Sequence, residues 1–262
     1  MNIGFIGAGN IASAIIGGII KDEFVKKENI KVYDVSEKVR ENYIKKGFEA
    51  VKTLEELLKC DIIFLTVKPQ FYTDVLEKMS YVKDKIIVTV APGITIAKVK
   101  SYLDSSNKVI RTMPNTPLMV GEGMTVIANE ENCDSQKLDF VISLFEKSGK
   151  VIKIKEELID SAVGVFSSSP AYVYMFIEAL ADGGVFNGID RNTALTLAAQ
   201  AVYGSAKMVL ETGMHPAELK DMVCSPNGTT IRAVKALEDN GFRSSILTAM
   251  DECYKRTKEL GK

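Results

Sequence analysis

The first twelve residues place the strongest constraint on what this chain can fold into. Met1–Ile6 is a short apolar run typical of a buried strand, and Gly7-Ala8-Gly9-Asn10-Ile11-Ala12 follows it directly. In this G-x-G-x-x-A pattern the first glycine permits a tight turn, the second lets a pyrophosphate approach the backbone, and the alanine lets the next helix pack closely. A helix is expected over 11–20. Strand, turn and helix in this order predict a dinucleotide-binding βαβ unit.

A second apolar run, Ile30–Asp34, ends in an acidic residue about 22 positions after Ala12. A carboxylate at this place binds the ribose 2′-hydroxyl of NAD and repels the 2′-phosphate of NADP. Ser36 and Lys38 follow closely and offer a hydroxyl and a cation to a phosphate. The residues therefore favour NADH slightly and leave NADPH open. A simple glycine turn would not explain why strand, helix and acid are in register.

The composition excludes several classes of protein. The chain has 262 residues, 46% of them hydrophobic, and a net charge of −1, so it is globular and has no field that favours nucleic acid or an anionic membrane. No signal peptide is expected, and the apolar stretch 171–181 is too short to cross a bilayer. Its four cysteines are widely spaced, so no metal site or disulfide framework is expected and a cytoplasmic location fits.

Strands and helices alternate through the first half of the chain. Further strands are expected over 61–67, 85–90, 108–112, 124–128 and 151–154, and the capping box Thr53-x-x-Glu56 begins one of the helices between them. Continuous β-branched runs are typical of parallel strands covered on both faces. The expected fold is α/β, with an N-terminal Rossmann-type doubly wound sheet over 1–155. Ligands of such sheets bind beyond the carboxyl ends of the strands.

From residue 156 onward the patterns are helical. Helices are expected over 156–166, 171–186, 192–210, 229–238 and 245–260, giving an all-helical C-terminal domain over 156–262. The 192–210 segment is rich in alanine, and small residues permit close helix packing. The sequence leaves open whether that packing lies inside the domain or across a dimer.

The run 224–233 has the pattern of an anion-binding helix start. Pro226 and Gly228 favour a tight turn, and apolar residues at helical spacing begin after Thr229. Free backbone N–H groups and the helix dipole suit a carboxylate or phosphate there. Ser225, Thr229 and Thr230 add hydroxyls. The alternative is an ordinary helix cap, because serine and threonine are common at that position.

Few residues are placed to act as a general acid. The single histidine, His215, precedes a proline in a turn-like segment and is expected to be structural. Lys68 follows a strand and serves cofactor support equally well. A hydroxyl-rich anion pocket suits a substrate that carries its own carboxylate and needs little acid catalysis. A cyclic imine carboxylate fits this description, since it can bind already protonated on nitrogen.

The chain resembles the pyrroline-5-carboxylate reductase family over essentially its whole length. The resemblance is carried by Phe5–Asn10, Val67–Pro69, Arg111–Pro117, Ser169–Val173, Glu178–Gly184, His215-Pro216 and, most specifically, Leu219–Ile231. It implies reduction of 1-pyrroline-5-carboxylate to L-proline with NADPH or NADH, the final step of proline biosynthesis. It also implies dimers formed through the helical domain, often assembled into a decamer of five dimers.

The resemblance also assigns residues. Thr230 would be the catalytic residue, and because its hydroxyl is a weak acid, its role would be to orient and stabilise the ring nitrogen. The implied substrate-binding set is Val223, Ser225, Gly228, Thr229 and Thr230. With the fingerprint, the expected cofactor-binding set is Ile6, Gly7, Ala8, Gly9, Asn10, Ile11, Asp34, Ser36, Thr66, Val67, Lys68, Pro69, Val90, Ala91, Pro92 and Asn115.

Two departures from the family pattern stand out. Asn227 occupies a position where the family usually has glycine, and asparagine tolerates positive φ, so the turn is expected to survive. Phe166 stands near the start of the helical domain, where the family has small residues. Neither change removes a hydroxyl from the predicted site.

Two rival functions are weighed against the reductase. A β-hydroxyacid dehydrogenase-like reductase shares the domain plan but needs a catalytic lysine early in the second domain, and no lysine lies between Lys155 and Lys207. A non-enzymatic dinucleotide- or pyridoxal-binding regulator would keep the sheet and lose the chemistry. The hydroxyls of Ser225 and Thr230 argue against it.

Overall fold

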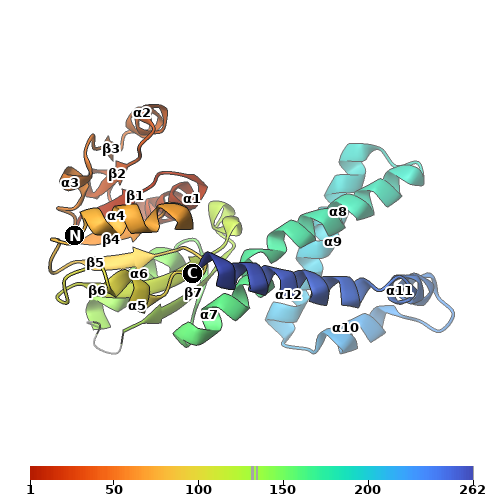
Figure 1. Ribbon diagram of the computed structural model, residues 1–262. Coiled ribbons are helices and arrows are strands. Elements are labelled where there is room, and N and C mark those ends of the chain that lie inside the picture. Colours follow the sequence, from red (N-terminus) through yellow and green to blue (C-terminus); the bar gives the residue numbers. More distant parts are fainter. Residues whose placement is uncertain (131–132, 134, 262) are drawn as a thin grey trace. The chain divides into compact units, whose positions relative to one another are not determined.

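The computed structural model describes residues 1–130, 133 and 135–261. They form two compact units, Met1–Ser168 with Glu252–Lys262, and Ser169–Asp251 (Figure 1). The helix α7 (Glu156–Ala162) belongs to the first unit, although the sequence analysis places everything from residue 156 in the helical domain. The reason is packing, because Ile159 of α7 is buried against Met113 of the sheet.

An eight-stranded sheet forms the centre of the first unit, in the order β3-β2-β1-β4-β5-β6-β7-β8. Its strands are β1 (Ile3–Ile6), β2 (Ile30–Tyr33), β3 (Glu49–Ala50), β4 (Ile62–Leu65), β5 (Ile86–Thr89), β6 (Lys108–Pro114), β7 (Gly123–Asn129) and β8 (Gly149–Lys153). All the strands expected from the sequence are present. The two-residue β3 was not expected, since it is too short to show a periodic pattern. The order 3-2-1-4-5-6 is that of a doubly wound nucleotide-binding sheet.

One pairing departs from the expected parallel sheet. β7 runs antiparallel to β6, with Arg111 opposite Ala128, whereas the other described pairs are parallel. Only 115–122 connects these two strands. A parallel crossover needs a dozen or more residues, so the short connection forces the antiparallel direction. The expectation of parallel strands is wrong at this pair.

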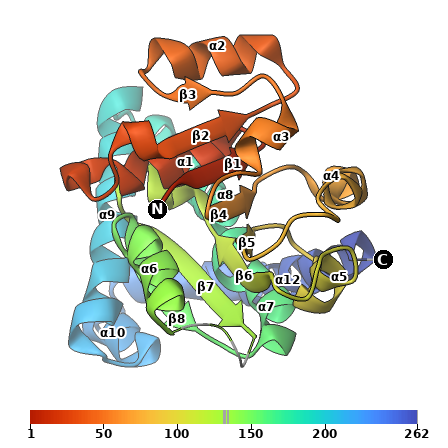
Figure 2. The ribbon, with the colours of Figure 1, turned by 90° about the vertical axis from the view of Figure 1, so that its left-hand side faces the viewer.

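Helices cover both faces of the sheet (Figure 2). The hydrophobic cluster on one face includes residues of α1 (Asn10–Ile19), α2 (Glu37–Lys45) and α6 (Ser135–Glu146). The cluster on the other face includes residues of α3 (Leu54–Leu57), α4 (Tyr72–Lys78) and α5 (Ile96–Lys100). Adjacent strand residues serve opposite faces, so Phe5 joins the first cluster and Ile6 the second. Thr53 caps α3 as predicted, with its Oγ1 3.4 Å from the amide nitrogen of Glu56.

The second unit is helical. It contains α8 (Ser169–Phe186), α9 (Arg191–Thr212), α10 (Pro216–Val223), α11 (Thr229–Asp239) and the first part of α12 (Phe242–Leu260). The short helix α10 was not expected, because its Gly-Met-His-Pro start has the pattern of a turn. His215 caps α10, with Nδ1 accepting from the amide of Ala217 at 3.2 Å, so the predicted structural role of this histidine is confirmed.

The alanine-rich helix α9 packs on α8 inside the second unit. Ala181, Ala194 and Ala198 form the buried cluster between the two helices. The same unit leaves many large apolar side chains exposed, among them Tyr174, Met175, Phe176, Leu180, Leu197, Tyr203, Met208, Leu210, Met222 and Leu247. Of the described helices, none combines the length and the apolar character that crossing a membrane requires.

Candidate active site

Four parallel strands end in line at one edge of the sheet. Ile6 pairs with Tyr33 on one side and with Leu65 on the other, and Leu65 pairs with Thr89. The winding of the sheet reverses between β1 and β4, at the place where α/β sheets bind ligands. The tertiary structure therefore brings together the predicted cofactor segments, which are Ile6–Ile11, Asp34 with Ser36, Thr66–Pro69, and Val90–Pro92.

The glycine loop after β1 has the geometry of a pyrophosphate site. Gly7 has φ +92°, and a Cβ there would lie 2.9 Å from the amide nitrogen of Val67, so no other residue fits. At Gly9, a Cβ would meet no heavy atom of the described residues within 4 Å. Gly9 is also the N-cap of α1, and no side chain caps this helix. Open space beside uncapped amides is what an approaching phosphate requires.

Thr66 fastens this loop to the neighbouring strand. Its Oγ1 lies 3.0 Å from the carbonyl oxygen of Ile6 and 2.6 Å from that of Gly7. The hydroxyl is therefore already engaged by the protein. Thr66, predicted to bind the cofactor, shapes the site by holding the turn.

A buried tyrosine that was not among the predicted site residues is hydrogen-bonded at the ends of β4 and β5. The Tyr72 hydroxyl donates to the carbonyl of Leu65 at 2.7 Å and shares a hydrogen bond with Thr89 Oγ1 at 2.9 Å. Burial raises the pKa of Tyr72 far above its usual value, so the hydroxyl stays protonated. Its role is to position the ends of β4 and β5. A single tyrosine in a helical segment does not indicate such a contact in the sequence.

Asp34 contacts the glycine loop as well as its own turn. Its Oδ2 accepts from the amide of Ala8 at 2.9 Å, and its Oδ1 accepts from the amide of Ser36 at 2.9 Å. Arg40 Nη1 donates to the carbonyl of Asp34 at 2.6 Å. Lys38 is the cation expected here from the sequence. Arg40, which reaches back from the first turn of α2, is a second cation that the sequence pattern does not indicate.

Both polar atoms of the Asn115 side chain are hydrogen-bonded to backbone groups. Its Nδ2 donates to the carbonyl of Phe166 at 2.9 Å, and its Oδ1 accepts from the amide of Met124 at 2.8 Å. Phe166 lies in the π-helical turn Val163–Ser167 and packs against a cluster that includes Val126. Asn115 thus ties the loop after β6 to β7 and to this turn. Its predicted contact with the cofactor stays a prediction.

The second unit holds the predicted anion turn. Gly228 is the N-cap of α11, and its amide donates to the carbonyl of Ser225 at 3.0 Å. A Cβ on Gly228 would overlap the Ser225 hydroxyl oxygen, so a larger residue there would displace that hydroxyl. Asn227 adopts φ +57°, as its tolerance for the left-handed region predicts. Its Oδ1 accepts from Arg232 Nη2 at 2.9 Å, a contact that the sequence analysis did not foresee.

The structure does not support the alternative of an ordinary side-chain cap. No side chain caps α11, and among the described residues none is hydrogen-bonded to the hydroxyls of Ser225, Thr229 or Thr230. The first-turn amides and these hydroxyls are therefore free to meet an anion. Val223, the other predicted substrate residue, ends α10 just before the turn and is 63% exposed.

These features define a class of protein. The chain has a doubly wound sheet with a G-x-G-x-x-A turn at its switch point, and it also presents a hydroxyl-lined helix start. Together these features are typical of a dinucleotide-dependent oxidoreductase that acts on a small anionic substrate.

Comparison with known proteins assigns the family. The model for pyrroline-5-carboxylate reductase dimerisation matches residues 156–260, and the model for NADP oxidoreductase, coenzyme F420-dependent, matches residues 2–93. The pyrroline-5-carboxylate reductase of Escherichia coli is 45% identical over 99% of this chain and 98% of its own length. That of Methanosarcina acetivorans is 41% identical over 99% and 98%. The chain belongs to the pyrroline-5-carboxylate reductase family, whose members are NAD(P)H-dependent oxidoreductases.

Solved structures agree over the whole chain. The pyrroline carboxylate reductase of Plasmodium falciparum with NADP bound is 33% identical with a TM-score of 0.93, covering 100% of this chain and 98% of that one. The 1-pyrroline-5-carboxylate reductase of Streptococcus pyogenes is 30% identical with a TM-score of 0.91, covering 99% and 98%. These likenesses support the reductase over the dehydrogenase and regulator alternatives.

Proposed function

We propose that this chain reduces 1-pyrroline-5-carboxylate to L-proline with NADH or NADPH, the final step of proline biosynthesis. The observation that carries the proposal is the start of α11. No side chain caps this helix, and the hydroxyls of Ser225, Thr229 and Thr230 have no hydrogen-bond partner among the described residues. A carboxylate is the group that such a helix start binds best. Family membership supplies the rest of the argument.

The roles of the residues follow from their placement. The bound dinucleotide supplies the hydride. Gly9 admits its pyrophosphate, and Asp34 binds its ribose. The Ser225–Thr229 turn holds the substrate carboxylate through backbone N–H groups and hydroxyls. The Thr230 hydroxyl oxygen accepts from the N–H of the protonated imine and fixes the orientation of the ring. Because the imine binds already protonated, hydride addition at carbon gives the amine without a general acid.

The test is turnover of 1-pyrroline-5-carboxylate by the native chain, Thr230→Ala and Thr230→Ser. Turnover is measured as the oxidation of NADH or of NADPH. We expect Thr230→Ala to lower kcat/KM roughly 100-fold, the size of effect seen when one positioned hydrogen-bonding group is removed from an active site, and Thr230→Ser to retain most activity. A folded native chain that binds a dinucleotide but turns over neither would contradict the proposal.

For the cofactor we propose a preference for NADH. The support is the carboxylate of Asp34, whose remaining lone pairs are available to a ribose 2′-hydroxyl and whose charge opposes a 2′-phosphate. Arg40, in the first turn of α2, donates to the carbonyl of Asp34 and is the residue best placed to pair with a phosphate when NADPH binds.

We also propose a homodimer formed through the helical unit, and its assembly into a decamer of five dimers. The support is the apolar surface of α8 and α9 together with the dimerisation model that matches this part of the chain. A second copy would cover the exposed groups. The cytoplasm, as a compartment that holds NAD(P)H, is the proposed place of the reaction.

A further inference from the structure

Arg111 is a cation buried inside the first unit. It lies on β6, is 1% exposed, and is the largest of the fully buried side chains. Its neighbours in the sheet are Thr89 on β5 and Ala128 on β7, neither of which is charged. A guanidinium in such a place is costly unless carboxylates pair with it.

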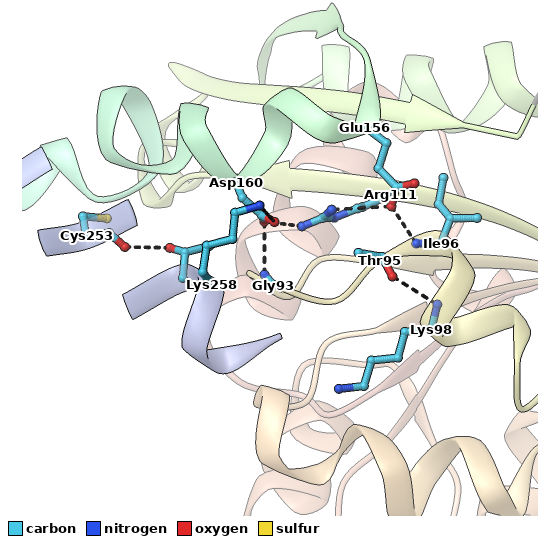
Figure 3. Close-up of polar contacts among 10 residues, drawn as sticks. Gly93, Thr95, Ile96, Lys98, Arg111, Glu156, Asp160, Cys253 and Lys258 are labelled. Carbon is cyan, nitrogen blue, oxygen red and sulfur yellow. Dashed lines mark hydrogen bonds and ion pairs between the residues drawn. The ribbon is translucent and has the colours of Figure 1, made fainter. Parts of the chain in front are cut away.

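Two carboxylates of α7 pair with this guanidinium, and both also hold a loop. Nη2 of Arg111 donates to Asp160 Oδ1, and Nη1 lies 3.4 Å from Glu156 Oε1. The same two oxygens accept backbone hydrogen bonds, from the amide of Gly93 at 3.3 Å and from that of Ile96 at 2.6 Å. Figure 3 shows Arg111 between the two carboxylates and the loop beneath them. Arg111 therefore fixes both anchors of the loop that follows β5.

The same loop is in close contact with the C-terminal end of α12. Gly93 has φ +75°, and a Cβ there would lie 2.6 Å from the amide nitrogen of Gly261. Lys98 Nζ donates to the carbonyl of Gly261 at 3.1 Å, and Lys258 Nζ lies 3.8 Å from Asp160 Oδ2. A shift of the loop would break contacts with both α7 and α12.

Stability alone does not explain an arginine at this position. Replacing a buried ion pair with apolar residues is often neutral or stabilising. In addition, Arg111 Nε is buried and has no hydrogen-bond partner among the described residues. What the arginine achieves is a defined position for Gly93, the residue directly after the predicted cofactor segment Val90–Pro92.

We propose that Arg111 is a positioning residue for dinucleotide binding. Through Asp160 and Glu156 it holds the backbone of Gly93–Ile96, and thereby sets where Val90–Pro92 meets the cofactor. The inference rests on the proposed function only in assigning Val90–Pro92 to the dinucleotide.

The experiment compares Arg111→Met, Arg111→Lys and the double variant Arg111→Met/Asp160→Asn. The double variant also removes the charge of Asp160, the more buried of the two carboxylates left behind. Asn107→Ala is the matched control. Asn107 is equally buried, immediately before β6, and it bonds the amide of Lys85 and the carbonyl of Val82 instead of the loop. Three quantities are measured without substrate: the Kd for NADH and NADPH by fluorescence titration, hydrogen exchange of the peptide 90–98, and Tm.

We expect Arg111→Met and the double variant to raise both Kd values about tenfold, a typical size for coupling between distant groups. Exchange of the peptide 90–98, which contains the amides of Gly93 and Ile96, should accelerate in the same variants. Arg111→Lys should restore part of the affinity, because lysine keeps the charge but cannot bond both carboxylates in a fork. Asn107→Ala should lower Tm and leave the Kd values unchanged.

The proposal is wrong if Arg111→Met behaves like Asn107→Ala, with a lower Tm but unchanged Kd and exchange. Faster exchange with an unchanged Kd would also overturn it, since the loop would then be anchored without consequence for the dinucleotide. If Arg111→Met does not fold, Arg111→Lys and the double variant give the same comparison. A native chain that binds NADH tightly but reduces no 1-pyrroline-5-carboxylate would contradict the proposed function alone.

Discussion

The carboxylate of Asp34 accepts a hydrogen bond from the backbone amide of Ala8, with Oδ2 2.9 Å from the nitrogen. The residue predicted to choose between NADH and NADPH therefore also braces the turn that receives the pyrophosphate. A substitution at this position has two separable consequences, one for charge and one for the shape of the glycine loop.

Replacing Asp34 with asparagine separates these two effects. Asn keeps an oxygen that can accept from Ala8 but removes the charge that opposes a 2′-phosphate. We expect the ratio of kcat/KM for NADPH to that for NADH to rise about tenfold, equivalent to ~1.4 kcal/mol. Asp34→Ala, which removes the acceptor as well, should weaken both cofactors. Steady-state kinetics with each dinucleotide measures the ratio, and an unchanged ratio in Asp34→Asn would mean that this carboxylate does not set the preference.

Alanine at each of the two fingerprint glycines should affect a different property, stability at Gly7 and dinucleotide affinity at Gly9. Gly7→Ala forces positive φ on alanine and places a Cβ 2.9 Å from the amide nitrogen of Val67, so it should cost more than ~1 kcal/mol of unfolding free energy. Gly9→Ala meets no described atom within 4 Å, and should lose dinucleotide affinity with a smaller loss of stability. Urea denaturation and NADH titration separate the two. Equal losses of stability would contradict this assignment.

The turn before α11 gives a prediction for the substrate site. Asn227→Ala removes both the tolerance for φ +57° and the acceptor for Arg232, so we expect a loss of ~1 kcal/mol in stability and a higher KM for 1-pyrroline-5-carboxylate. Asn227→Gly keeps the backbone freedom and loses only the exposed contact with Arg232, so both quantities should be closer to native than in Asn227→Ala. The Kd for NADH should not change in either variant. A native KM in Asn227→Ala would show that the turn tolerates distortion.

The proposed dimer can be tested on the apolar groove of the helical unit. Ala201 lines this groove with Phe176, Leu180, Val202 and Val209. Ala201→Glu would place a charge in a surface that a second copy should cover, and we expect it to shift the chain toward monomer in light scattering after size exclusion. Gln200→Glu adds the same charge one residue away, where a polar side chain already stands, and serves as the control. A monomeric native chain, or an unaffected dimer in Ala201→Glu, would remove the support for this interface.

Much of the first unit can be predicted from sequence, because its signals are local. The turn at Gly7–Ala12, the apolar strand runs and the Thr53 cap each occupy a few consecutive residues, and those residues determine their own backbone conformation. The anion turn at 225–230 is similarly local, since its proline, glycine and hydroxyl residues are consecutive or nearly so. The small elements β3 and α10 were missed, since neither is long enough to show a period.

The tertiary structure determines the contacts between residues that lie far apart in the chain. The antiparallel direction of β7, the contact of Asp34 with Ala8 and the two bonds of Asn115 depend on which segments meet. The clearest case is Arg111, whose sequence context gives only an arginine in an apolar strand. Its partner Asp160 lies 49 residues away and reaches it because α7 packs on the sheet. Local pattern specifies backbone conformation, whereas the partners of a buried charge are set by packing between elements, which no spacing in the sequence records.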